Sequence, residues 1–481
     1  MELSEIIAQR LSKLKSLKDK RIEPYGAASP ERLPISEVLT GFTEGKTCWL
    51  CGRVIAKRKH GKAVFCDLKD STGKIQLYLK EDIIGAENFS IFEDIEVADF
   101  ISVKGETFIT RTQEPSLKVL EFSLLCKAIR PLPEKWHGLK DIELRYRQRY
   151  LDFTANEDVV RVFRQRSEII RLTREFFDKR GYLEVETPMM QLIPGGARGR
   201  PFKTYHNEYD LELYLRIAPE LYLKKLLVAG LDRVYEINRN FRNEGISPRH
   251  NPEFTMLEAY TAYTDYRGVM RITEELIRFL ARSLFGKEEI NYQDKKIDLS
   301  KFEEISFAAV MKDEYGINPD DKLESWVVKL KKKGIEVKGE RISRSLVVNL
   351  IADLLNPVSD KPVFVTDFFT ELCPLAKKKK DDPLLSERFE LFLGGLEVAN
   401  AYSELNDPLE QKKRLQEELK DLPPEELRQL DEDFLIALEH GMPPAGGLGI
   451  GIDRLVMIFS NQPSIRDVIL FPLLKPHKPQ D

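Results

Sequence analysis

The sequence lacks long hydrophobic runs. No apolar stretch approaches the roughly 18 residues that a membrane-spanning helix needs, and the first residues show neither the apolar stretch nor the small-residue cleavage site of a signal peptide. Both features argue against a membrane or secreted protein. With 481 residues, 32% of them charged, we expect a soluble protein of two or more domains in the cytoplasm, with no membrane partner.

Cysteines are few and have no framework spacing. There are five, an odd number, which is typical of a protein in a reducing compartment. Cys48 and Cys51 form a C-x-x-C pair, but no second pair follows, and positions i and i+3 of a strand face opposite sides of a sheet. We therefore do not expect zinc or redox chemistry at this pair.

The motifs of several enzyme classes are also absent. The six histidines form no H-E-x-x-H motif, and no G-x-S-x-G elbow occurs. The glycine run at 446–451 is not a dinucleotide fingerprint, because Arg454 stands where its last glycine would be, and it is not a P-loop, because no G-K-[ST] follows. The net charge of -4 argues against coating of nucleic acid, so any RNA contact must come from local patches.

In the N-terminal part of the chain, the hydrophobic pattern changes near residue 45 from helical spacing to strand-like alternation. The first 21 residues repeat apolar positions at helical spacing with basic residues between them, which predicts a basic amphipathic helix in a helical extension over residues 1–44. The pattern leaves open whether this helix docks on its own domain or contacts RNA. Residues 45–130 alternate in five short strand-like runs, which favours a closed all-β barrel of the OB-fold type.

Phe65 and Gln76 fall on the second and third of these strands, the pair that an OB-fold presents to oligonucleotides. An exposed aromatic ring there can stack on a base while an amide reads the base edge. The barrel pattern alone makes Phe65 more typical of a core residue. Both interpretations of Phe65 stay open at this point.

The rest of the chain is expected to form a linker and a larger domain. Residues 131–150 contain a proline-punctuated segment typical of a linker, and residues 151–481 mix helices and strands without strict alternation. That mixture predicts an α+β fold with an antiparallel or mixed sheet flanked by helices. Its first long helix has two apolar stripes, through Val162 and Phe163, and we expect a subunit interface to cover one of them. A charged helical insertion at about 408–438 is expected to be a solvated surface.

The segment 241–260 concentrates ionised and aromatic side chains around a short loop. Strand periodicity places Arg242 and Glu244 on the same face of the strand before the loop. If the strand after the loop pairs with it as a hairpin, Phe254 can lie on that shared face. His250 lies in the loop between them. Arginine forks bind phosphate in a bidentate manner and an aromatic face accepts a purine, so this set suits a ligand the size of ATP.

A second expected hairpin, turning at residues 394–395, contributes carboxylates. Pairing across that turn places Glu390 and Glu397 diagonally on one face. Two carboxylates so placed are costly unless a cation lies between them, and the magnesium ion carried by ATP phosphates is the natural one. Arg454, after the glycine run, is a candidate contact for phosphate or for the adenine face.

Further polar residues of this hairpin alternate in the opposite phase from Glu397. They reach the same pocket only if a β-bulge interrupts the strand near residues 398–399, and we predict such a bulge. The residues concerned are Asn400, Tyr402 and Glu404.

Three segments together resemble the class II aminoacyl-tRNA synthetases, and within them the bacterial-type lysyl-tRNA synthetases, over residues 45–475. "GYLEVETPMM" is similar to motif 1, with Pro188 at the dimer interface, "FRNEGISPRHNPEFTMLE" to motif 2, and "GGLGIGIDR" to motif 3. Finding all three in order is a far stronger signal than any one of them. The resemblance implies a six-stranded antiparallel catalytic sheet, an OB-fold domain that reads the anticodon, and a homodimer.

The resemblance also implies roles at the nucleotide end of the site. Arg242 would bridge the amino-acid carboxylate and the α-phosphate of ATP. Glu244 would accept a hydrogen bond from the adenine amino group, and Phe254 would stack on adenine. His250 and Arg454 would contact phosphates.

Two further groups follow from the same resemblance. Glu390 and Glu397 would hold Mg²⁺ with ATP as the substrate. Phe65 and Gln76 match the aromatic and amide residues that contact the anticodon, which reverses the preference for Phe65 as a core residue. Glu114 matches a third anticodon contact.

The amino-acid pocket favours lysine. A substrate with a side-chain carboxylate would need a cation at that end, whereas this end offers carboxylates, which are what a buried ammonium requires. Arginine, with its planar fork, would favour a different geometry. In the family, Glu220 takes the α-amino group, and a loop with Gly195 and Gly196 closes over the substrate. The resemblance assigns the rest of the pocket to Glu258, Tyr260, Asn400, Tyr402 and Glu404.

The activity that the resemblance implies is ATP-dependent activation of L-lysine to lysyl-adenylate, followed by transfer of the lysyl group to tRNA-Lys. No general base is needed, because the lysine carboxylate is already the nucleophile. One alternative is a ligase that attaches lysine to a protein, but such enzymes lack a barrel like that of residues 45–130. Another is a non-catalytic RNA-binding protein, against which the retained arginines and glutamates of the site argue.

Overall fold

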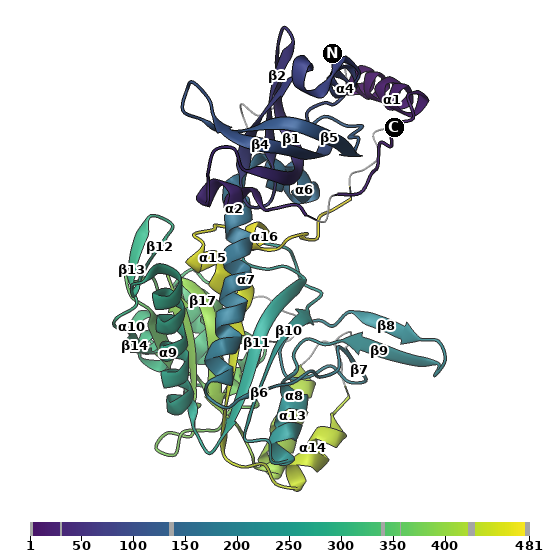
Figure 1. Cartoon of the computed structure of the whole chain (residues 1–481). Helices are drawn as coiled ribbons and strands as arrows, with labels where there is room; N and C mark the ends of the chain where they lie inside the picture. The colour runs from purple at the N-terminus through teal and green to yellow at the C-terminus, as the bar shows by residue number, and fades with distance from the viewer. Residues whose placement is uncertain are drawn as a thin grey trace. The chain divides into compact units, whose positions relative to one another are not determined.

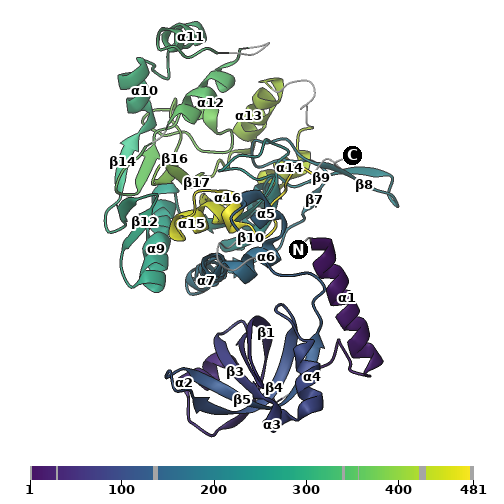
Figure 2. The same ribbon diagram turned by 90° about the horizontal axis from the view of Figure 1, so that it is seen from above.

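The computed structural model describes residues 3–28, 31–133, 139–337, 342–355, 357–421 and 429–476. The chain divides into two compact units, Met1–Lys140 and Asp141–Asp481. Figures 1 and 2 follow the chain through both of them. Each unit has its own sheet and its own hydrophobic core.

The first unit contains a closed five-stranded barrel, which confirms the predicted OB-fold. The strands follow the order β1-β2-β3-β5-β4, and the barrel closes because the long strand β1 pairs with both β2 and β4. Gly105 lies at a register shift of β4, where a Cβ atom would come within 2.3 Å of the Lys118 carbonyl oxygen. The strands are β1 (Thr47–His60), β2 (Ala63–Lys69), β3 (Lys74–Lys80), β4 (Phe100–Ile109) and β5 (Pro115–Cys126).

Helix α1 (Leu3–Asp19) docks on this unit. Arg10 is buried and donates hydrogen bonds to backbone carbonyls, including that of Val97. Lys13 forms an ion pair with Glu96 at 2.8 Å. The amphipathic helix is thus confirmed, and its docking on its own domain occupies part of its basic face, while RNA contact by the rest stays a prediction. The described residues of this unit form three further helices: α2 (Ile35–Thr40), α3 (Glu81–Ile84) and α4 (Ala86–Glu93).

The second unit is built on an eight-stranded sheet, in agreement with the predicted α+β class. Its six central strands pair antiparallel, as the resemblance implied, but a parallel strand is added at each edge: β14 beside β15, and β6 beside β10. In order across the sheet the strands are β14 (Glu303–Ser306), β15 (Val363–Thr366), β16 (Arg388–Leu393), β17 (Leu396–Ser403), β18 (Ala445–Gly451), β11 (Glu253–Ala262), β10 (Arg233–Phe241) and β6 (Leu183–Glu184).

The predicted β-bulge is present in β17. Leu391 pairs with Ala399 and Phe392 pairs with Glu397, so Val398 is the extra residue on the bulged strand. The turn before it has positive φ angles at both Gly394 and Gly395, which glycine adopts without steric cost. As a result Glu397 and the later polar residues of β17 share one face of the sheet.

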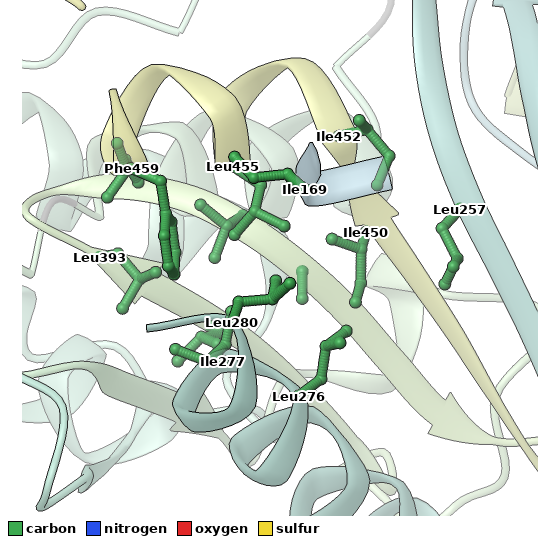
Figure 3. Close-up of a cluster of buried hydrophobic side chains, with 14 of the residues drawn as sticks. Ile169, Leu257, Leu276, Ile277, Leu280, Leu393, Ile450, Ile452, Leu455 and Phe459 are labelled. Carbon is green, nitrogen blue, oxygen red and sulfur yellow. The ribbon is translucent and has the colours of Figure 1, made fainter. Parts of the chain in front are cut away.

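Helices pack on the sheet around a large apolar core. Figure 3 shows side chains from α9 (Tyr266–Phe285) and α15 (Ile452–Phe459) meeting residues of the strands, among them Leu257 and Ile450. Leu257, Ile450 and their helical neighbours Leu280 and Leu455 are fully buried. Burial of this kind contributes on the order of 1.5–3 kcal/mol for each large apolar side chain.

Helix α7 (Glu157–Asp178) corrects one expectation. Both of its apolar stripes are largely buried within this chain, with Ile170 only partly covered, so most of their surface needs no partner subunit. Phe163 lies 5.2 Å from the ring of Phe153, and Phe177 stacks on Tyr235 at 5.2 Å. The covering ring of Phe153 comes from α6 (Arg149–Ala155), a helix immediately before α7.

Two other segments can be described further. Within the segment expected as a linker, residues 134–138 lie outside the described part of the chain, and residues 142–147 and 149–150 are helical, in α5 (Ile142–Arg147) and the start of α6. The insertion at about 408–438 contains α13 (Pro408–Asp421) and α14 (Glu432–Glu439), and Phe434 and Leu438 are buried in a cluster with residues of α8 (Glu220–Val228). The insertion is therefore not simply a solvated surface. Its residues 422–428 lie outside the described part of the chain.

The remaining elements lie outside the main sheet. Among the described helices, none combines the length and apolar character needed to cross a membrane. The elements are β7 (Met190–Gln191), β8 (Lys203–His206), β9 (Leu211–Leu215), β12 (Glu289–Tyr292), β13 (Lys295–Asp298), α10 (Phe307–Tyr315), α11 (Leu323–Lys332), α12 (Arg344–Leu354), the 3-10 helix η1 (Thr370–Leu372) and α16 (Ile465–Val468).

Candidate active site

The register of five adjacent strands places the polar residues in one row. Glu236 of β10 pairs with Glu258 of β11, which pairs with Gly449 of β18, which pairs with Asn400 of β17, which pairs with Glu390 of β16. Paired residues on neighbouring strands point to the same face of a sheet. The two predicted hairpins therefore share one polar face, with the glycine strand β18 between them.

A second row runs beside the first. Tyr260 of β11 and Tyr402 of β17 both pair with Gly447 of β18. A Cβ atom on Gly447 would lie 1.9 Å from Glu404 Oε1 and 2.7 Å from the Tyr260 ring. Glycine on β18 thus leaves room above the middle of the sheet for the side chains of its neighbours, and we call this strand the floor of the candidate pocket.

Three carboxylates are buried at one end of this floor. Glu220, Glu258 and Glu404 are each exposed by 5% or less. Tyr402 Oη donates to Glu220 at 2.6 Å, and Tyr260 Oη donates to Glu258 at 3.2 Å. A buried carboxylate without a cation is costly, so this end of the pocket has the chemistry of a site for ammonium groups.

Lys224 lies among these carboxylates and is fully buried. Its Nζ donates to Glu220 at 2.6 Å and forms an ion pair with Glu404 at 2.5 Å. Burial by itself lowers the pKa of a lysine, but Glu220 and Glu404 outweigh that effect, so the pKa of Lys224 is raised. The ammonium therefore stays charged at neutral pH.

Burial also sets the protonation of Glu258. It raises the pKa of this carboxyl to about 8, and the nearby Glu220 adds to the shift. Burial followed by the same Glu220 raises the pKa of the Tyr260 and Tyr402 phenols well above their usual value. Without a ligand, Glu258 is thus largely protonated at pH 7 and the two tyrosines are neutral donors.

The arginines lie at the other end of the polar face. Arg454 donates to the backbone carbonyl of Glu397 at 2.9 Å and to its carboxylate at 3.0 Å, and His250 Nε2 lies 3.2 Å from the guanidinium. Burial and the charge of Arg454 lower the pKa of His250. A cationic group beside a neutral imidazole suits the binding of an anion such as phosphate.

Arg242 follows β10 and lies over an aromatic ring. Its guanidinium carbon is 5.1 Å from the centroid of Phe254, and its Nε is buried without a hydrogen-bond partner within the described structure. Burial lowers the pKa of Arg242. Glu244 is exposed in the following loop, next to Gly199. An arginine donor left unsatisfied in a pocket is a natural contact for an incoming carboxylate or phosphate.

Glu390 and Glu397 form the candidate cation site. Arg388 donates to Glu390 at 2.5 Å, and Arg454 binds Glu397. Burial raises the pKa of Glu390 to about 7, Arg388 opposes that shift and Glu397 adds to it. Carboxylate oxygens suit Mg²⁺. Over the described ranges there is no cluster of three or more metal-ligating side chains, so an ion here would need further ligands from a bound phosphate.

The barrel presents the second predicted set of residues. Phe65 is only partly buried and lies outside the barrel core, with its ring 5.1 Å from that of Tyr78. Gln76 donates to Glu114 at 3.1 Å and accepts from Ser116 at 3.3 Å. The structure thus brings Gln76 and Glu114 together, and it leaves a partly exposed aromatic surface on the neighbouring strand.

Several site residues were not predicted from the sequence. Lys224 and Arg388 each lie close to a predicted carboxylate, at four residues after Glu220 and two before Glu390, and that spacing was the signal available. Gly196, which was predicted, lies against Glu220: a Cβ atom there would come within 2.8 Å of the Glu220 Cβ, and its φ angle is +83°.

Comparison with known families gives two matches. The model for tRNA synthetases class II (D, K and N) matches residues 141–475, and the model for the OB-fold nucleic acid binding domain of the anticodon type matches residues 48–125. The chain belongs to the class II tRNA synthetases (D, K and N).

Curated relatives resemble the chain over its whole length. The lysine–tRNA ligase of Carboxydothermus hydrogenoformans is 48% identical, covering 99% of each chain. That of Pelotomaculum thermopropionicum is also 48% identical, over 99% of this chain and 96% of the relative. That of Clostridium botulinum is 45% identical, again over 99% and 96%. The shared length includes both the barrel and the larger unit.

Glu258→Gln should change how stability depends on pH. Below pH 4.5 the carboxyl is protonated in both folded and unfolded chains; between 4.5 and about 8 only the folded state keeps the proton. Wild-type stability therefore falls with rising pH, whereas the amide carries no such penalty. Between pH 5 and pH 8, we expect the free energy of unfolding of the ligand-free variant to increase relative to that of wild type by up to about 3 kcal/mol.

Urea unfolding followed by circular dichroism measures this difference. Glu253→Gln is the matched control, because Glu253 lies on the same strand but is exposed. A constant difference between Glu258→Gln and wild type across this pH range would contradict the assignment of a raised pKa to Glu258.

Proposed function

We propose that this chain activates L-lysine with ATP to give lysyl-adenylate and transfers the lysyl group to tRNA-Lys. The observation that carries the proposal is the buried cluster of Glu220, Glu258 and Glu404 with two arginines nearby: Arg242 lies within the field of Glu258, and Arg454 pairs with Glu397. One end of the face suits ammonium groups and the other suits phosphate. Relatives that match the full chain are lysine–tRNA ligases, which supports the same activity here.

The pocket would hold both ammonium groups of lysine. Glu220, with the hydroxyl of Tyr402 bound to it, takes the α-amino group, and Glu404 with Glu258 takes the side-chain ammonium. Asn400 is oriented by Arg388, which donates to its side-chain oxygen at 3.3 Å. Gly196, against Glu220, belongs to the loop that closes over the substrate.

The reaction needs charge stabilisation rather than proton transfer. The lysine carboxylate attacks the α-phosphorus in line, a new oxygen–phosphorus bond forms, and the bond to pyrophosphate breaks. Arg242 binds the carboxylate and the α-phosphate, and Arg454 with His250 binds the departing phosphates. Phe254 stacks on adenine, and Glu244 accepts from its amino group. The Mg²⁺ ion that accompanies ATP neutralises phosphate charge and would be held by Glu390 and Glu397.

The barrel favours tRNA over a protein as the acceptor. A ligase that modifies a protein has no use for an anticodon-type domain, and the barrel matches that domain over residues 48–125. We propose that Phe65 stacks on an anticodon base and that Gln76 and Glu114 read base edges. The paired Gln76 and Glu114 support this role, because a fixed amide orientation is needed for readout.

We also propose a homodimer and a cytoplasmic location. Large apolar side chains are exposed along the motif 1 segment around Pro188, where the family implies the subunit contact. They are Leu183, Met189, Met190 and Leu192. All five cysteines are free thiols, which suits a reducing compartment.

Amino-acid-dependent exchange of labelled pyrophosphate into ATP tests the activation step. We expect exchange with lysine and none with aspartate, asparagine or arginine. Arg242→Ala should lower the rate by about 100- to 1,000-fold, because it removes a group that stabilises the transition state. Arg161→Ala, at an exposed arginine of α7, should leave it unchanged. Exchange with aspartate or asparagine instead of lysine would contradict the proposed substrate.

Phe65→Ala should affect tRNA but not lysine activation. Loss of one stacked base costs roughly 1–3 kcal/mol, so the KM for tRNA-Lys in aminoacylation should rise about 5- to 100-fold. The rate of pyrophosphate exchange, measured without tRNA, should stay at the wild-type value. Tyr25→Ala removes an exposed ring elsewhere on the same unit and should change neither. An unchanged KM for tRNA in Phe65→Ala would exclude the stacking role.

A further inference from the structure

Lys224 is a buried cation inside a pocket whose proposed ligand is itself a cation. It lies on α8 one turn after Glu220, and its Nζ reaches both Glu220, at 2.6 Å, and Glu404, at 2.5 Å. Glu404 directly follows β17. A single ammonium therefore joins a helix and a strand end through the two carboxylates proposed to bind substrate.

The side chain of Lys224 is completely shielded from solvent by its neighbours. Its Nζ lies 5.6 Å from the ring of Tyr402 and 5.9 Å from that of Phe434, and the side chain has no exposed surface. Gly447 lies beneath Glu404, where any Cβ atom would clash with the carboxylate. Glu404 thus has the Lys224 ammonium on one side and the Gly447 backbone on the other.

The charges of the cluster match those of lysine. When Glu220, Glu258 and Glu404 are all ionised, three carboxylates and the one ammonium of Lys224 leave two net negative charges. Free lysine carries two ammonium groups, and its carboxylate is assigned to Arg242. Glu236 does not enter this count, because it is paired with Arg216 at 2.7 Å.

We propose that Lys224 is a positioning residue for lysine recognition: it fixes Glu220 and Glu404 and sets the pocket charge to balance the two substrate ammonium groups. This inference rests on the proposed lysine-activating function. Lys224 does not touch the reacting atoms in this scheme. Its ammonium lies between two neighbouring buried carboxylates, and at Glu404 it opposes the rise in pKa that burial and Glu220 cause.

The groups facing this centre come from each element packed against it. They are Glu220, Glu258, Tyr260, Cys373, Tyr402 and Glu404. Lys377 acts on Glu404, and Arg388 acts on Cys373, as more distant positive charges. Arg242 acts on Glu258 as a further positive charge. Removal of the Lys224 charge takes away the main group that opposes protonation of Glu404, so ionisation of Glu404 should shift to higher pH.

Lys224→Met, which keeps the length but removes the charge, tests the inference in pyrophosphate exchange. At pH 7 the KM for lysine should rise about 10-fold, the change in ionised fraction that one unit of pKa shift produces. The kcat and the KM for ATP should stay within about 3-fold of wild type, because the substitution leaves Arg242 and Arg454 unchanged. The acidic limb of the lysine KM profile should move to higher pH by about one unit.

The neighbouring residue provides the control. Lys225 is partly exposed and pairs with Asp433 at the surface, so Lys225→Met should match wild type in every parameter. If Lys224→Met does not fold, Lys224→Gln serves in its place, since its amide can still donate to both carboxylates without a charge. The same rise in KM and the same pH shift are expected for it.

The outcomes separate the inference from the function on which it rests. A KM for lysine that is unchanged or lower in Lys224→Met would overturn the inference, and a lower value would show that Lys224 competes with substrate. If the KM for lysine and the KM for ATP both rise and kcat falls to a similar extent, without a shift of the pH profile, the inference would also be overturned in favour of a structural role. Absence of lysine-dependent exchange in both wild type and Lys225→Met would overturn the proposed function itself.

Discussion

The electrostatic cost of burying Glu220, Glu258 and Glu404 together is the constraint on which the rest of this site depends. Each carboxylate is almost without exposed surface, and Glu258 and Glu404 both lie within the field of Glu220. The fold offsets that cost in two ways within the free protein. Burial raises the pKa of Glu258 and of Glu404 to about 8, so both can hold a proton, and Lys224 supplies a positive charge to Glu220 and Glu404. The positive charge that the cluster still lacks is what a ligand with ammonium groups would supply.

The geometry around that cluster follows from the strand register and from the glycines of one strand. The bulge at Val398 brings Glu397 and the later residues of β17 onto one face, and the glycines of β18 leave that face open in the middle. Carboxylates and arginines then occupy opposite ends of one floor. A substrate with ammonium groups at one end and a reactive carboxylate at the other would span the two ends, with ATP beyond it.

Much of this could be predicted from the sequence, because the decisive features are local. Alternation and turn residues indicated the barrel and both hairpins, and the phase of Glu397 against Asn400 required the bulge. Coverage of a helix by a neighbouring segment is not local. The burial of Phe163 by Phe153, and of Phe434 by residues of α8, depends on packing that periodicity does not report. Lys224 was missed because a lysine in an amphipathic helix is most often a solvated residue.

The most direct test of the central claim is the number of protons released when lysine binds. Titration calorimetry at pH 7 in two buffers of different ionisation enthalpy gives this number. If substrate ammonium groups ionise Glu258 and Glu404, whose pKa values are both about 8 in the free protein, lysine binding will release one to two protons, and norleucine, which lacks the side-chain ammonium, will bind weakly with less release. A binding heat for lysine that does not depend on the buffer would contradict the account.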